Sequence, residues 1–196
     1  MTDAYLDIET TGLSLFYDYI TVIGIYLCFD SEEKLVQLYG SQVTPNNLVA
    51  ALQGVRRIYT YNGKRFDLPF IDAFLGVNLE NDFEHHDLMF TCWEYNLKGG
   101  FKAVERQLQI PRQTEGITGL DAVRLWRQYL DNYDEDALNL LLQYNKEDVM
   151  NLKILRERLA EQERWREDNQ AKRFADAEVV SQIHHLTKKY FGFWGC

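Results

Sequence analysis

The fold is decided near the N-terminus by the stretch AYLDIETTGL, residues 4–13. Apolar and polar residues alternate along it, which predicts a β-strand whose successive side chains point to opposite faces. Leu6 and Ile8 then lie on one face. Asp7 and Glu9 lie on the other, where two neighbouring carboxylates repel each other and are costly to bury unless a cation lies between them. The pattern favours a site for a hard divalent ion such as Mg²⁺ or Mn²⁺, and the alternative is an exposed strand end with two solvated acids.

A second segment with a carboxylate covers residues 56–71. It predicts a short strand, an Asn-Gly turn and the start of an apolar helix, with Asp67 in the first helical turn. An acid at this position also complements the positive end of the helix dipole. A purely structural role for Asp67 is therefore the alternative to a role in catalysis.

A third segment, residues 140–152, predicts a helix. Leu141, Tyr144 and Asp148 recur in it at helical spacing, so Tyr144 and Asp148 share one face. A charged Asp in an apolar stripe departs from the usual helix pattern, and such departures often mark functional sites. The alternative is an acid at the edge of the stripe, in contact with water.

Taken together, the three segments resemble the three motifs of the DEDD 3′→5′ exonuclease superfamily, whose fold is ribonuclease-H-like. The matching residues are Asp7 and Glu9 in the first motif, Asp67 in the second, and Tyr144 and Asp148 in the third. A tyrosine four residues before the last Asp resembles the tyrosine subclass (DEDDy), whereas the histidine subclass has its base at the position of Gln143. The segment YNKEDV, residues 144–149, is most similar to YprB-type ribonuclease-H-like domains. The resemblance spans roughly residues 4–155.

The resemblance implies hydrolysis of phosphodiester bonds with two Mg²⁺ or Mn²⁺ ions. It implies that Asp7 bridges the two ions, that Glu9 and Asp148 complete the site that activates water, and that Asp67 holds the second ion. The hydroxyl of Tyr144 has an ordinary pKa near 10, so we expect it to orient the attacking water rather than to act as a base.

The substrates implied by the resemblance are single-stranded or frayed 3′ ends of DNA or RNA. The expected contacts to the substrate are Thr10, Leu13, Asn62, Phe66, Lys98 and Lys102. Leu13 could equally be a packing residue after a glycine turn, and Asn62 also suits a plain Asn-Gly turn. The stretch KGGFK, residues 98–102, could present backbone N–H groups to a phosphate, but an ordinary turn before a helix is the simpler interpretation.

The charge is unusual for a nucleic-acid enzyme. The net charge is −9, and residues 1–152 carry 12 Lys and Arg against 23 Asp and Glu. Proteins that bind nucleic acids without sequence preference usually have a basic surface. Phosphate contacts must therefore come from local basic groups, and the candidates are Arg56, Arg57, Lys64, Arg65, Lys98, Lys102 and Arg106.

The order of elements predicts an α/β fold with a mixed five-stranded sheet flanked by helices. After the first strand, further strands are expected at residues 20–29, 35–39, 56–61 and 83–88, and helices at residues 45–54, 66–76, 101–108, 119–131 and 134–159. Residues 1–159 would form the ribonuclease-H-like domain. Residues 160–196 would form a helical extension with an aromatic end, packed on the domain, on a protein partner or on a second copy of the chain, with an aromatic stacking surface as a further alternative.

Length and composition suit one domain with a sizeable core: 196 residues, of which 46% are hydrophobic and 14% aromatic. No signal peptide or membrane span is expected, so the chain is interpreted as cytoplasmic. Three functions compete: an active 3′→5′ exonuclease, a catalytically quiet module that binds nucleic acid or acts as a scaffold, and a ribonuclease-H-like endonuclease. The complete set of four acids argues against the second, and Tyr144 argues against the third.

Overall fold

The computed structural model describes residues 2–29 and 32–191. It divides the chain into two compact units, one up to Arg156 and one from Glu157 onward. In its described part, the first unit contains one five-stranded sheet with helices on both faces, and the second consists of a continuing helix. Residues 192–196, which belong to the predicted aromatic end, lie outside the described residues.

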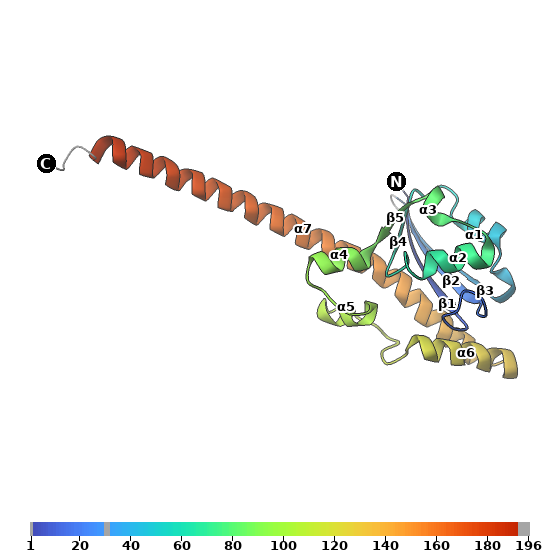
Figure 1. The fold of residues 1–196 in the computed structure, drawn as a ribbon. Helices are drawn as coiled ribbons and strands as arrows, with labels where there is room; N and C mark the ends of the chain where they lie inside the picture. Colours follow the sequence, from blue (N-terminus) through green and yellow to red (C-terminus); the bar gives the residue numbers. More distant parts are fainter. Residues whose placement is uncertain (1, 30–31, 192–196) are drawn as a thin grey trace. The chain divides into compact units, whose positions relative to one another are not determined.

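The sheet has the strand order β3-β2-β1-β4-β5, with the carboxylate-bearing strand in the middle (Figure 1). The strands are β1 (Asp3–Thr10), β2 (Ile20–Cys28), β3 (Glu33–Tyr39), β4 (Arg57–Thr60) and β5 (Glu84–Asp87). Strands β1, β2 and β3 pair antiparallel, whereas β4 pairs parallel with both β1 and β5. The mixed five-stranded sheet predicted from the sequence is therefore confirmed.

Helices cover the two faces of this sheet, and each face has its own apolar cluster. The α-helices of the described residues are α1 (Pro45–Ala51), α2 (Asp67–Leu75), α3 (Leu79–Asp82), α4 (Leu88–Glu94), α5 (Phe101–Gln107), α6 (Gly119–Asn132) and α7 (Glu135–Phe191). Leu6 and Ile8 of β1 pack with helices α1, α2 and α3 on one face. Val22 of β2 packs with α6 and the first turns of α7 on the other face. Asp7 and Glu9 face this second layer, because side chains alternate along β1.

Two short α-helices were not predicted, and the strands predicted at residues 20–29, 56–61 and 83–88 are one or two residues too long. Leu88, expected to end the fifth strand, is instead the first residue of α4. Strand β5 stops at Asp87 because the Asp87 carboxylate accepts a hydrogen bond from the backbone N–H of Met89 at 3.1 Å and so caps the helix. Asn78 caps α3 in the same way, accepting from the backbone N–H of Asn81 at 3.1 Å.

The last helix, α7, is a single helix of 57 residues. It begins close to its predicted start and continues past residue 159, as expected for a helical extension. Up to Arg156 it belongs to the unit that contains the sheet. No helix in the described part of the chain combines the length and the hydropathy needed to cross a membrane.

Candidate metal centre and its cleft

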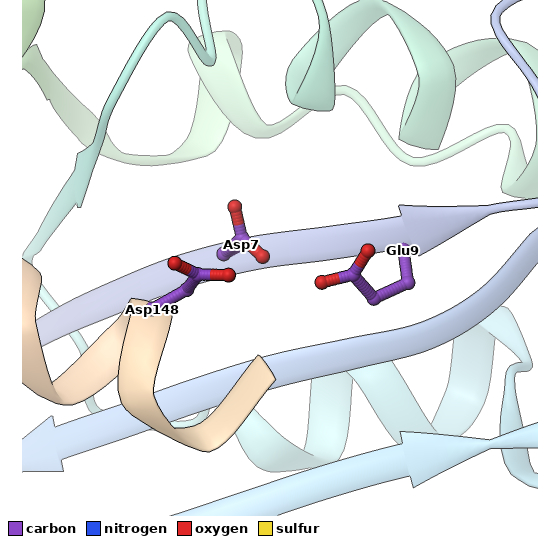
Figure 2. A group of neighbouring side chains, drawn as sticks. All are labelled: Asp7, Glu9 and Asp148. Atoms are coloured by element: carbon purple, nitrogen blue, oxygen red, sulfur yellow. The ribbon is translucent and has the colours of Figure 1, made fainter. Parts of the chain in front are cut away.

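Three carboxylates from β1 and α7 converge at one point. Oxygen atoms of Asp7, Glu9 and Asp148 all lie within 4.8 Å of one another, and Figure 2 shows the three side chains gathered between the strand and the helix. Glu9 and Asp148 are only 7% and 6% exposed. Burial and mutual repulsion raise the pKa values of Asp7 and Glu9 well above the ordinary range of carboxyl groups. A divalent cation would offset this cost, and three carboxylate oxygens are the donor set that Mg²⁺ or Mn²⁺ takes.

The fourth predicted acid, Asp67, lies beside this cluster at the start of α2. It is buried, and its Oδ1 accepts a hydrogen bond from the backbone N–H of Ile8 at 3.1 Å. Burial raises its pKa to about 7, partly offset by that hydrogen bond. Asp67 is not among the three carboxylates that meet within metal-ligand distance, but it lines the same cleft as they do.

Tyr144 lies one turn before Asp148 on α7, and its hydroxyl is held by Lys102. Lys102 Nζ donates a hydrogen bond to the Tyr144 hydroxyl oxygen at 2.7 Å and another to the backbone carbonyl of Ile117. The ammonium nitrogen also lies 4.0 Å from the centre of the Tyr144 ring. Burial and the neighbouring carboxylates raise the pKa of Tyr144. The hydroxyl therefore stays protonated at neutral pH, and its proton is available for a hydrogen bond.

A buried arginine that sequence reasoning missed contacts the cluster. Arg112 Nη2 donates hydrogen bonds to Glu105 Oε1 at 2.8 Å and to Asp148 Oδ1, and Arg112 Nε donates to Glu105 Oε2 at 3.0 Å. Burial raises the pKa of Asp148 to about 6, while Arg112 acts in the opposite direction. The backbone after Arg112 is tied to α7, because the Glu147 carboxylate accepts from the N–H groups of Gln113 and Thr114 at 3.0 and 2.9 Å.

Asn145, which was also not predicted, is hydrogen-bonded to Asp7. Asp7, Gly24 and Gln37 are opposite one another on β1, β2 and β3. Asn145 of α7 lies over this row, fully buried, and its Nδ2 donates to Asp7 Oδ2 at 3.3 Å and to the Asp7 carbonyl at 3.4 Å. Gln37 Nε2 in turn donates to Asn145 Oδ1 at 3.0 Å. A Cβ atom on Gly24 would lie 2.3 Å from Asn145 Oδ1, so the glycine makes room for the asparagine.

The turn that precedes Asp67 is held by Asp87. The Asp87 carboxylate accepts hydrogen bonds from the backbone N–H groups of Asn62, at 2.7 Å, and Lys64, at 3.1 Å. Asn62 has a left-handed backbone, with φ 64°, a conformation that asparagine tolerates better than most residues. The turn places Asn62 and Phe66 in the lining of the cleft described below, together with the carboxylates.

The carboxylates lie where two openings meet. The first is a cleft of about 330 Å³ that all five predicted catalytic residues line, together with four of the predicted substrate contacts: Thr10, Leu13, Asn62 and Phe66. Leu120 and Val123 of α6 form part of the same lining and were not predicted. The second opening, of about 460 Å³, is lined by Asp7 and Asp148 together with Lys102 and Arg106. Lys98 lines neither opening.

Comparison with known protein families identifies the superfamily of this chain. Residues 4–160 match the family model described as the RNase_H superfamily. The chain belongs to this superfamily. The ribonuclease-H-like fold expected from the three motifs is thereby confirmed. No curated protein is significantly similar to the chain in sequence.

Solved structures share the fold at low sequence identity. The family B DNA polymerase of the hyperthermophilic archaeon Pyrobaculum calidifontis aligns over 82% of this chain with a TM-score of 0.65 and 18% identity. The chain corresponds to only 24% of that polymerase. Brucella melitensis NrnC with bound Mg²⁺ aligns over 98% of this chain and 88% of its own, with a TM-score of 0.56 and 19% identity. NrnC bound to pGG aligns over the same shares, with a TM-score of 0.56 and 18% identity.

Proposed function

We propose that this chain is a metal-dependent exonuclease of the DEDD type, tyrosine subclass, similar to YprB-type domains, which removes nucleotides from the 3′ ends of DNA or RNA. The observation that carries the proposal is the convergence of Asp7, Glu9 and Asp148 within 4.8 Å in the cleft that Tyr144 also lines. Membership of the RNase_H superfamily supports it. So do the two fold neighbours: NrnC, which binds Mg²⁺ and pGG, and a family B DNA polymerase.

The acids of the site would hold two Mg²⁺ or Mn²⁺ ions, Asp7 between them, Glu9 and Asp148 on one, and Asp67 on the other. Such ions, when bound, lower the pKa of a water and stabilise the charge that develops on the leaving 3′ oxygen. Asn145 keeps the Asp7 carboxylate in place through its amide group. Arg112 does the same for Asp148 and leaves the second oxygen of that carboxylate to a metal ion.

Tyr144 would position the attacking water. Because Lys102 donates to the Tyr144 hydroxyl oxygen, the hydroxyl keeps its own proton for a different acceptor. A water bound in the cleft is such an acceptor, and orienting it brings the reacting atoms into line at little entropic cost. Lys102 would also face the scissile phosphate, since it lines the opening that contains Asp7 and Asp148.

The cleft would receive the last nucleotide of the strand. It has a volume of about 330 Å³, and four of the expected substrate contacts line it together with the acids. Thr10 and Leu13 would contact the terminal sugar and base, and Asn62 and Phe66 the same nucleotide from the other wall. Lys98 lies outside both openings, so it would reach only a strand that extends beyond the site.

The direct test is hydrolysis of end-labelled single- and double-stranded DNA and RNA with Mg²⁺, with Mn²⁺ and with excess EDTA. We expect a ladder that shortens from the 3′ end when metal is present and no product in EDTA. A 3′-phosphate should suppress the ladder. Full activity of the purified protein in EDTA would refute the metal-dependent mechanism, and cleavage of a closed circular strand would favour an endonuclease.

Two variants connect this activity with the acids. Asp7→Asn and Asp148→Asn should each lose at least about a hundredfold in rate, because each empties a metal site. At the same Mn²⁺ concentration they should also show a smaller rise in melting temperature than the wild type, because their affinity for Mn²⁺ is lower. Asp131→Asn is the matched control, since Asp131 is an exposed acid on α6 outside both openings. Equal Mn²⁺ responses in Asp7→Asn and Asp131→Asn would contradict the proposed metal centre.

A further inference from the structure

The loop between β1 and β2 exposes large apolar side chains beside the cleft. Phe16 and Tyr17 are 90% and 91% exposed, and Leu13, in the same loop, is 83% exposed. Such side chains next to one another on a surface usually mark an interaction site. Leu13 is already assigned to the cleft, whereas Phe16 and Tyr17 have no role in the fold or in the proposed reaction.

Hydrogen bonds of its polar groups fix the conformation of the loop, and in this conformation the two aromatic rings are exposed. The Asp18 carboxylate accepts hydrogen bonds from the Thr11 hydroxyl at 3.0 Å and from the Ser14 N–H at 2.9 Å. Backbone hydrogen bonds join Thr11 N–H to the Tyr19 carbonyl and Asp18 N–H to the Ser14 carbonyl, both at 3.0 Å. A Cβ atom on Gly12 would lie 2.4 Å from Asp18 Oδ2, so glycine is needed for this closure. The polar groups face inward and the rings face water.

We propose that Phe16 and Tyr17 form a stacking surface for unpaired bases of the substrate strand, upstream of the nucleotide held in the cleft. This inference rests on the proposed function. It adds that the preferred substrate is a single strand of several nucleotides rather than a dinucleotide or a fully paired end.

Two observations select this occupant. The first is continuity: Gly12 and Leu13 line the cleft that contains the carboxylates, and Phe16 is three residues further along the same loop. Three Cα steps span at most about 11 Å, so a strand whose last nucleotide fills the cleft can reach the rings within a few nucleotides. The exposed Leu120 of α6 lines the same cleft and extends its apolar lining.

The second observation is charge. The chain carries a net charge of −9, and residues 1–152 hold 23 acids against 12 bases. Attraction to phosphates is therefore limited to a few basic side chains, such as Lys102 and Arg106, and to the proposed metal site. Stacking would add a contact that the negative charge does not oppose. Base stacking on aromatic side chains is independent of charge and of base identity. Residues 13–17 contribute no charged side chain, which suits stacking better than ionic contact with phosphates.

Equilibrium binding of fluorescent strands with free 3′ ends, in EDTA to prevent cleavage, tests this inference. The Phe16→Ala/Tyr17→Ala double variant should raise the Kd of an eight-nucleotide strand by on the order of ten- to a hundredfold. The Kd of a dinucleotide should change by less than about twofold. Tyr17→Phe should behave as the wild type, because the stacking ring is kept. The dependence of the Kd on salt should have the same slope in the wild type and in the double variant, because no ionic contact is removed.

Tyr133→Asn is the matched control for loss of an exposed aromatic side chain. Tyr133 is 84% exposed at the end of α6 and has φ 54°, a conformation that asparagine tolerates. This variant should bind both strands as the wild type does.

Several outcomes would overturn the inference. An unchanged Kd for the eight-nucleotide strand in the double variant would do so. Equal weakening for both strand lengths would show that the loop only shapes the cleft. Conversion of a dimer to a monomer without loss of strand binding would assign the rings to contact between copies of the chain. If the wild type neither hydrolyses nor binds any strand, the proposed function fails and the inference fails with it. If the wild type is active and the double variant matches it, the inference alone fails.

Discussion

Replacing Gly24 with alanine should disturb the candidate metal centre without touching any of its acids. The added Cβ would lie 2.3 Å from Asn145 Oδ1 and 2.9 Å from both Cγ and Nδ2 of the same side chain. Asn145 is fully buried and cannot turn into water. It must move away from the sheet, and its hydrogen bonds with Asp7 and Gln37 are then lost or lengthened.

The magnitude follows from these contacts. Overpacking of a filled interior costs about 1–3 kcal/mol, and each lost hydrogen bond costs about 0.5–1.5 kcal/mol. With two hydrogen bonds lost, we therefore expect Gly24→Ala to lower the free energy of unfolding by roughly 2–6 kcal/mol. For a chain of this size the melting temperature should fall by about 5–25 °C. The affinity for Mn²⁺ should fall as well, because Asp7 loses the amide that holds it.

The assay is thermal unfolding of Gly24→Ala, Asn145→Ala and the double variant. In the Asn145→Ala background the space beside Gly24 is free, so Gly24→Ala should cost less than about 0.5 kcal/mol there. Gly119→Ala is the matched control, because a Cβ at Gly119 meets no atom within 4 Å. Strictly additive effects of the two substitutions, or a neutral Gly24→Ala, would refute the steric argument.

Three further outcomes are expected. The first, in EDTA, follows from the raised pKa of Asp67, about 7. Between about pH 4 and 7 the folded protein binds more protons than the unfolded chain, so its stability falls as the pH rises. Asp67→Asn should flatten the curve of melting temperature against pH, and an unchanged slope would contradict this. Arg112→Leu leaves Glu105 and Asp148 buried without their cation, and chemical denaturation should show a loss of about 3–5 kcal/mol, whereas a loss below about 1 kcal/mol would show that the ion pair is dispensable. Tyr144→Phe should keep Mn²⁺ binding and lose on the order of ten- to a thousandfold in turnover, while Asp148→Asn should be partly rescued by added Mn²⁺; equal losses that Mn²⁺ does not restore would reject the different roles of the two residues.

Part of the fold could be predicted because it depends on local periodicity. Alternation in residues 4–10 places Asp7 and Glu9 on one face of a strand, and the spacing of four between Tyr144 and Asp148 places them on one face of a helix. Both patterns are properties of a few consecutive residues. Helices α3 and α4 were not predicted, because the caps at Asn78 and Asp87 that start them lie on either side of a strand of only four residues, and Asp87 is both the last residue of that strand and the cap of α4.

The sequence by itself therefore determined the five strands, five of the helices and the faces on which the acids lie. Its three motifs also grouped the acids into one proposed site. Only the tertiary structure decided their supports. Arg112 reaches Asp148 across 36 residues, and Asn145 reaches Asp7 across 138. Nothing in the residues around Arg112 or Gly24 shows that a carboxylate or an amide will face them. The physical reason is that periodicity records which face of an element is buried, whereas hydrogen bonds and ion pairs depend on which elements pack together and at what distance.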